Sequence, residues 1–163
     1  MIHIGLYLVF LVLVAGYAGF RGGAPERIAA AGMVIGTALT FAAQASLIEG
    51  DFGSVELGVM LVDTALLALC FALAIVSSRF WPLWLSALMI VQVASHLPKL
   101  LSSTVPPFSY AIVLGLWGYP LLLTIAVGTW RHRTRLKAHG ADPSWAPFFE
   151  AWMKRRRKAG RIA

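Results

Sequence analysis

The sequence has few residues of the kind that carry out covalent or redox chemistry. It contains one cysteine, Cys70, which excludes an intrachain disulfide and any site built on paired cysteines. Cys70 lies in the middle of an apolar run, so we interpret it as a small buried residue. Nucleophile motifs, phosphate-binding loops and glycine-rich dinucleotide turns are also missing from the sequence. Acyl transfer and nucleotide-dependent redox chemistry therefore have no support in it.

Charged residues are scarce as well. They make up 13% of the 163 residues, whereas a soluble domain carries about 25%. Mean hydropathy is +0.76. The apolar residues fall in runs of about 20 that are rich in Leu and Ala, which favours membrane helices over strands. The composition therefore predicts an all-α, polytopic membrane protein with a single domain.

Five apolar runs are separated by short connectors that are polar or rich in glycine and proline. In the fifth run Pro120 cannot donate a backbone hydrogen bond, so we expect a kink there. Trp81 and Trp84, next to the third connector, are expected to anchor the chain at the membrane interface. The bundle of residues 1–130 is predicted to contain five transmembrane helices, over residues 2–20, 25–48, 55–78, 82–101 and 108–130.

The Lys and Arg residues predict how these helices are oriented. With the N-terminus outside, all of the 14 except Lys99 fall on the cytoplasmic side, in two connectors or in the tail. The acidic loop with Glu49 and Asp51 then lies outside. This pattern follows the positive-inside rule, and it predicts an N-out, C-in protein of the bacterial inner membrane. It also argues against nucleic acid as the cause of the net charge of +7, because the positive residues flank apolar runs.

A carboxylate and an imidazole stand out within the predicted helices. Asp63 lies in the third run, and Gln92 and His96 lie one helical turn apart in the fourth. An Asp at the centre of a membrane helix costs about 2.5 to 3.5 kcal/mol, so it usually faces the bundle interior and finds a partner. Because neighbouring helices are antiparallel, Asp63 and His96 come to a similar depth in the outer third of the bilayer. Gln44 reaches the same depth, and we predict a polar cluster of Gln44, Asp63, Gln92 and His96.

Four interpretations of this cluster stay open. It can be a hydrogen-bonded pair that fixes helix packing, a proton- or ligand-handling site that opens outward, or the acid–base pair of a lipid-active enzyme. In the fourth interpretation, Asp63 and His96 never meet. His3 and Tyr110 are expected near the same surface. A zinc, iron or haem site built from His3, Asp63 and His96 lacks supporting ligand spacing. No catalytic or metal-binding residue is assigned, and any cofactor is unknown.

Small residues form a stripe on the second predicted helix. Gly32 and Gly36 make a small-x-x-x-small pattern, which allows two helix backbones to approach closely. We expect this stripe to pack against another helix of the same chain. A homodimer face is the alternative.

The tail, residues 131–163, is strongly basic. Asp142 or Ser144 is expected to cap a short helix over residues 144–158. Its apolar residues recur at helical spacing and are followed by an unbroken basic run. This pattern resembles an interfacial amphipathic helix on anionic lipid at the cytoplasmic face, and docking onto a membrane protein partner is the alternative. The predicted surface residues are Trp145, Phe148, Phe149, Trp152, Lys154, Arg155, Arg156, Arg157 and Lys158.

Several short segments resemble small multi-helix membrane proteins of alphaproteobacteria, the sphingomonads especially. These segments are Gly22 to Arg27, Ser78 to Trp84, Ser95 to Leu97 and Leu116 to Pro120. The resemblance covers residues 1 to about 132, and the long basic tail extends beyond it. It implies a bacterial inner-membrane protein and implies no activity.

Together these patterns favour a small integral membrane protein without catalytic activity, acting as an accessory or structural component. A small transporter or proton-coupled carrier with an outward-facing site at Asp63 and His96 is the first alternative. No inverted repeat supports it. A lipid- or quinone-modifying membrane enzyme is the second alternative.

Overall fold

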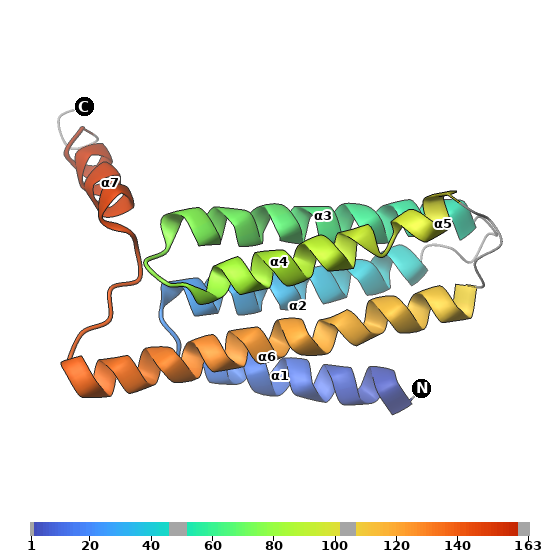
Figure 1. Ribbon diagram of the computed structural model, residues 1–163, viewed down its shortest axis with the longest axis horizontal. Coiled ribbons are helices and arrows are strands. Elements are labelled where there is room, and N and C mark those ends of the chain that lie inside the picture. Colours follow the sequence, from blue (N-terminus) through green and yellow to red (C-terminus); the bar gives the residue numbers. More distant parts are fainter. Residues whose placement is uncertain (1, 46–51, 102–106, 160–163) are drawn as a thin grey trace.

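The computed structural model describes residues 2–45, 52–101 and 107–159, and the regular structure in these ranges is helical (Figure 1). This confirms the all-α prediction for the described part of the chain. Side chains that the sequence singled out at His3, Glu49, Asp51, Tyr110, Arg156 and Lys158 lie outside the described residues. The helices are α1 (Ile2–Arg21), α2 (Ala24–Ala45), α3 (Phe52–Val76), α4 (Trp81–Ala94), α5 (Leu97–Leu101), α6 (Pro107–His139) and α7 (Pro147–Ala159).

The long helices form one elongated bundle (Figure 1). Helix α1 packs against α2 and α6, α2 also contacts α3 and α6, and α4 packs against α3 and α6. Contacts therefore run around a closed ring of α1, α2, α3, α4 and α6. The helix α7 stands apart at the end of the bundle where α1 ends and α2 begins, and it runs crosswise to the bundle (Figure 1).

The core consists of small and branched apolar side chains that point into this ring. Each of the five long helices contributes to it, and the side chain of Cys70 is one of its members. The core residues are Leu11, Val14, Ala18, Ala29, Ala30, Met33, Cys70, Leu73, Trp81, Leu85, Met89, Leu121, Leu122 and Ile125.

Three of the described helices are long and apolar enough to cross a membrane: Ile4–Arg21, Ala24–Gln44 and Leu57–Val76. Their outer faces are apolar too. Val12 in α1 is 69% exposed, Ile35 in α2 is 58% exposed and Leu61 in α3 is 65% exposed. Large apolar side chains on several outer faces of one bundle need an apolar surrounding, which lipid provides.

The fourth predicted helix, residues 82–101, is wrong as a single element. The structure divides it into α4 and α5, with Ser95 and His96 between them. Pro98 explains the division, because it has no N–H for the carbonyl of Ala94 and its ring would clash with that carbonyl. The helix α4 accordingly ends at Ala94.

The predicted end of the fifth helix at residue 130 is also wrong, because α6 continues to His139. Gly140 ends the helix with φ of +70°, and its N–H donates to the carbonyl of Leu136 at 2.9 Å. This is the left-handed C-terminal cap that glycine favours. The prediction ended the helix where the apolar run ends, but hydropathy has no bearing on where the backbone stops being helical.

The two tryptophans expected at the membrane interface differ. Trp84 is 61% exposed, whereas Trp81 is 7% exposed and belongs to the core. The ring of Trp81 packs against Gly128 of α6, where an added Cβ would lie 2.8 to 3.0 Å from three indole carbons. Trp81 is therefore a core residue, and its assignment as an interface anchor is wrong.

Candidate functional site

Asp63 of α3 meets Gln92 of α4 and His96 in the bundle interior. Asp63 Oδ2 is 2.9 Å from Gln92 Nε2 and 2.9 Å from His96 Nε2. An ionised carboxylate only accepts, so both nitrogens donate to it. The three residues are 6%, 8% and 2% exposed. This arrangement satisfies the buried carboxylate with two donors from the neighbouring helix.

The division between α4 and α5 places His96. Its backbone N–H donates to the carbonyl of Val93 at 3.1 Å. This hydrogen bond spans three residues, as in a 3₁₀ turn, which is wound more tightly than an α-helix. Ser95 closes the last turn of α4, with its N–H 2.9 Å from the carbonyl of Val91 and its hydroxyl 2.8 Å from the same carbonyl. Pro98 thus creates the break, and the break turns the imidazole toward α3.

Gln44 is not part of this cluster. Its residue is exposed, while Asp63, Gln92 and His96 are buried. The amide oxygen of Gln92, Oε1, is buried and has no hydrogen-bond partner among the described residues. In the part of the chain that the structure describes, no three His, Cys, Asp or Glu side chains gather in a way that could hold a metal ion.

The glycine stripe of α2 lies against α3 of the same chain. A Cβ added at Gly32 would lie 2.6 Å from Leu69 Cδ2, and one added at Gly36 would lie 2.5 Å from Leu66 Cδ1. Both glycines are buried. The two leucines therefore occupy the space that the missing side chains leave, and α2 and α3 pack closely.

A second polar network, which the sequence analysis did not find, lies at the end of the bundle where α3 ends and α4 begins. Glu26 of α2 and Arg79 of the α3–α4 turn form an ion pair, with the guanidinium Nη1 donating to Glu26 Oε1. The indole N–H of Trp81 donates to the same oxygen at 2.9 Å. The side chains of Glu26 and Arg79 are 0% and 1% exposed. These are the most deeply buried charges among the described residues with ion pairs.

The tail completes this network through Asp142. Its Oδ2 is 3.2 Å from Arg79 Nη2 and 2.6 Å from His132 Nδ1, and its Oδ1 is 3.3 Å from Arg135 Nε. Arg79 Nη2 also lies 3.4 Å from the carbonyl of Asp142 and 3.4 Å from the hydroxyl of Ser144. One carboxylate thus joins basic side chains from α6 and from the α3–α4 turn. We call the set of Glu26, Arg79, Trp81, His132, Arg135, Asp142 and Ser144 the Arg79 network.

Backbone hydrogen bonds join the same two segments. Ala146 N–H donates to the carbonyl of Val76 at 2.9 Å, and Ser78 N–H donates to the carbonyl of Ser144 at 3.3 Å. The hydroxyl of Ser78 donates to the carbonyl of Pro143. Between them, Ser77 and Trp145 form an isolated antiparallel bridge. The residues just before α7 are therefore fastened to the end of α3 like a short strand pair.

This pairing corrects the predicted capping of the tail helix. The helix α7 begins at Pro147, and Asp142 and Ser144 lie too early in the chain to cap it. Both serve the Arg79 network instead. Proline suits the first turn of a helix, since its missing N–H would have no partner there.

The sequence did contain a signal for this network. Glu26 lies in a region of positive charge, three residues after the pair Gly22 and Gly23. An added Cβ at Gly23 would lie 2.8 Å from Arg79 Nη2 and 3.1 Å from Ser144 Oγ. The glycine is needed because the guanidinium passes over it. A lone carboxylate beside two glycines in a basic connector was therefore a sign of a buried ion pair.

The aromatic residues of the tail divide into two groups. Trp145 packs against the bundle core, so it is not a surface residue of the kind predicted. Phe148 and Trp152 on α7 are 59% and 51% exposed. The ring centroids of Trp145 and Phe149 are 5.5 Å apart, and those of Phe149 and Trp152 are 5.6 Å apart. A row of aromatic rings thus leads from the bundle core onto α7.

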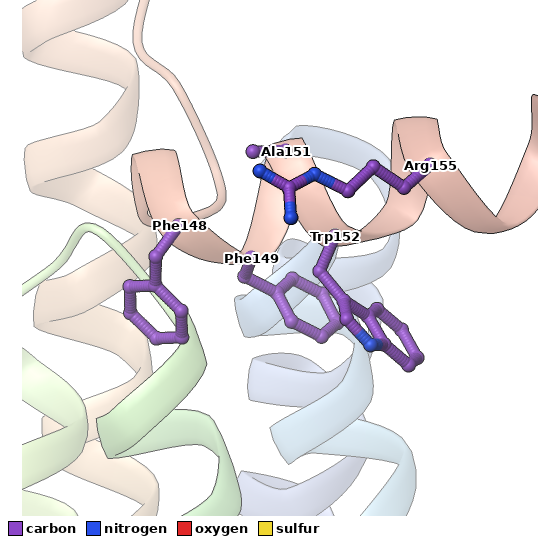
Figure 2. A pocket seen from close by; sticks show the side chains of 5 residues that line it. All are labelled: Phe148, Phe149, Ala151, Trp152 and Arg155. Carbon is purple, nitrogen blue, oxygen red and sulfur yellow. The ribbon is translucent and has the colours of Figure 1, made fainter.

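Figure 2 shows the open hollow on α7, lined by Phe148, Phe149, Ala151, Trp152 and Arg155. All of its lining residues come from one helix, so it is an uncovered helix face. The rings of Phe148, Phe149 and Trp152 hang from one side of the helix (Figure 2). Lys154, Arg155 and Arg157 are exposed on the same helix.

Comparisons of this chain with protein-family models, with curated proteins and with solved structures gave no match. Its function is therefore argued from the two polar networks and from α7.

Proposed function

We propose that this chain is a small bacterial inner-membrane protein with five transmembrane segments, acting as a non-catalytic accessory or structural component of the membrane. One observation carries the proposal. Asp63 and His96, ionisable groups inside the predicted membrane region, are buried and hydrogen-bonded to each other. In membrane bundles such polar pairs between helices hold the helices together. The acidic group serves packing, and no substrate is needed to account for it.

The number of spans is supported by the arrangement of the helices. Besides α1, α2 and α3, residues 81–101 run alongside them as α4 and α5, and α6 runs alongside α1 (Figure 1). Residues 81–101, of which 19 are helical, extend about 30 Å, which is the thickness of the hydrocarbon core. The broken fourth segment and the first part of α6 are therefore long enough to be the fourth and fifth spans.

The orientation is supported by the distribution of charge. Arg21 ends α1, Arg27 lies in the first turn of α2, Arg79 precedes α4, and the basic half of α6 lies at the same end of the bundle (Figure 1). Lys99 lies on α5 at the other end. By the positive-inside rule the first of these ends is cytoplasmic. The α7 face with Phe148 and Trp152 then lies at the cytoplasmic surface, where anionic lipid is the partner that we propose.

The proposal is tested by replacing the polar residues with apolar ones of similar size. The variant Asp63→Leu with Gln92→Met and His96→Leu is purified in a mild detergent beside the wild-type protein. For an accessory component, we expect the variant to fold and to retain the same co-purifying membrane protein. Loss of that partner from a folded variant would show that the polar groups act beyond packing.

A proton-coupled carrier is the second candidate, and two observations favour it. His96 lies at a helix discontinuity, which is where transporters place their ion sites. Gln92 Oε1 is buried and lacks a partner among the described residues. Proteoliposomes that contain a pH-sensitive dye distinguish the candidates. A proton flux that Asp63→Asn abolishes would establish the carrier and overturn the accessory role.

A further inference from the structure

The direction of α7 relative to the bundle is determined by the segment that precedes the helix. On α7 itself, Phe148 and Trp152 are more than half exposed. The preceding residues 142–146, by contrast, make ion pairs with Arg79, backbone hydrogen bonds with Val76 and Ser78, and an apolar contact of Trp145 with the core. The helix therefore has the direction that this fastened segment imposes on it.

The charged part of that attachment is concentrated on one residue. Asp142 is 9% exposed at its side chain and contacts Arg79, His132 and Arg135. Arg79 in turn is held by Glu26. The Asp142 carboxylate is buried and is shared by three basic side chains. Its position is therefore defined, because the three partners approach it from different directions. Asp142 thus fixes the position of the tail relative to the bundle.

The imposed direction suits a membrane surface. The axis of α7 is crosswise to the bundle (Figure 1), so it lies along the leaflet when the bundle crosses it. The rings of Phe148, Phe149 and Trp152 project from one side of the helix, and the bundle lies below them in the view of Figure 2. Lys154, Arg155 and Arg157 are exposed on the same helix. Rings reaching into the acyl boundary, with long cationic side chains at headgroup level, characterise helices that lie on anionic membranes.

We infer that Asp142 and Arg79 are positioning residues, which hold α7 flat against the anionic headgroups of the cytoplasmic leaflet with its aromatic face toward the lipid. The inference rests on the proposed function, since it needs the bundle to cross the membrane. It adds that the docking helix is oriented by a buried ion-pair network and does not find its orientation on the lipid alone.

The experiment measures which face of α7 meets lipid in the full-length protein. Cys70, the single cysteine, is replaced by Ala, and a spin label is placed at Phe148→Cys or at Lys154→Cys. Lys154 is exposed and lies opposite the face that carries Phe148, Phe149 and Trp152, because successive helical residues are about 100° apart. The protein is reconstituted into vesicles of phosphatidylcholine with phosphatidylglycerol, or of phosphatidylcholine alone. Collisions of each label with oxygen and with a water-soluble nickel chelate give its access to lipid and to water.

In vesicles with phosphatidylglycerol, we expect the label at 148 to collide mainly with oxygen and the label at 154 mainly with the chelate. Asp142→Asn is expected to reduce this difference several-fold in protein that stays folded. Its melting temperature is expected to fall less than that of Arg79→Ala, because Glu26 still pairs with Arg79. Glu150→Gln is the matched control, because it removes the same charge from the tail outside the network. It is expected to keep the difference intact.

Each of the other outcomes overturns a defined part of this inference. A difference that survives Asp142→Asn shows that the network does not orient α7, while the surface helix itself stands. Two labels that are equally open to the chelate in the unsubstituted background overturn the surface helix and with it the proposed membrane partner. A difference of equal size without phosphatidylglycerol shows that apolar contact alone holds α7, and it removes the anionic headgroup from the inference.

Discussion

The two polar networks of this bundle lie at different levels and differ in what they connect. Asp63, near the middle of α3, joins that helix through Gln92 and His96 to the α4–α5 segment, which follows it directly in the chain. The Arg79 network lies at the end of the bundle where α3 ends, and it joins α2, the α3–α4 turn, α6 and the tail through Arg79 and Asp142. The first is a local contact between neighbours, whereas the second connects segments more than 50 residues apart.

The two networks also differ in the kind of charge that they bury. An Asp–His pair can become neutral by moving one proton, so its burial need not leave two full charges. An arginine keeps its charge in any protein environment, so Arg79 needs its partners at all times. The group that can become neutral thus lies along the length of the bundle, and the permanent charge lies at one of its ends. The Arg79 network is therefore expected to matter more for stability.

The largest effect is expected from Arg79→Ala. This change leaves the carboxylates of Glu26 and Asp142 without the guanidinium that joins them. Removing one partner of a buried ion pair costs about 3 to 5 kcal/mol, which is a large share of the stability of a small domain. Thermal unfolding in detergent, followed by circular dichroism, measures the loss.

Arg27→Ala is the control, since Arg27 lies at the same end of the bundle and is exposed. Its removal is expected to change the free energy of unfolding by less than about 0.5 kcal/mol. If the two arginine variants unfold at the same temperature, the network is not a source of stability, and the contrast between the two networks disappears.

A smaller effect is expected from packing against the same network. Gly128→Ala places a Cβ within 2.8 to 3.0 Å of three atoms of the Trp81 ring, which is buried and donates to Glu26. A rigid ring held at both ends cannot turn away, and overpacking of this kind costs about 1 to 3 kcal/mol. Gly36→Ala meets the end of the Leu66 side chain, which can rotate, so its cost is expected to be lower.

Gly19→Ala completes this series, because nothing lies within 4 Å of the Cβ that it adds. Alanine favours a helix over glycine by up to about 1 kcal/mol, so this variant is expected to be neutral or slightly stabilised. Melting temperatures in the order Gly19→Ala, Gly36→Ala, Gly128→Ala, from highest to lowest, would agree with the contacts. A Gly128→Ala variant as stable as Gly19→Ala would show that Trp81 is free to move.

The all-helical fold and the meeting of Asp63 with His96 could be predicted from the sequence because both follow from simple rules. Apolar runs separated by short connectors give antiparallel neighbours, and antiparallel neighbours bring Asp63 and His96 to the same depth. The end of α6 was missed because hydropathy was used to place it, while Gly140 was not considered as a helix stop. The break at Pro98 was missed for the same reason.

The Arg79 network could not be predicted from periodicity, because it depends on where the tail returns to the bundle. Asp142 and Ser144 reach Arg79 only because α6 continues to His139 and then turns back at Gly140. With the helix ended at residue 130, the tail had no defined path. The end of α6 was placed nine residues too early, so the network, which consists of residues from four segments, was not predicted. Gly23 and Glu26 were the residues that indicated part of it.

The smallest effect is expected for the coupling between Asp63 and His96, which sharpens the comparison of the two networks. A double-mutant cycle of Asp63→Asn and His96→Gln measures how much of each loss depends on the other residue. Hydrogen bonds between membrane helices contribute about 0.6 to 2 kcal/mol, and Gln92 still donates to position 63 in each variant. We therefore expect a coupling of about 1 kcal/mol, below that of the corresponding cycle for Glu26→Gln and Arg79→Gln, where two full charges lose each other. A larger coupling at Asp63 than at Glu26 would reverse the assignment of the stabilising role, and it would mean that the intramembrane pair carries a full charge pair despite its ability to become neutral.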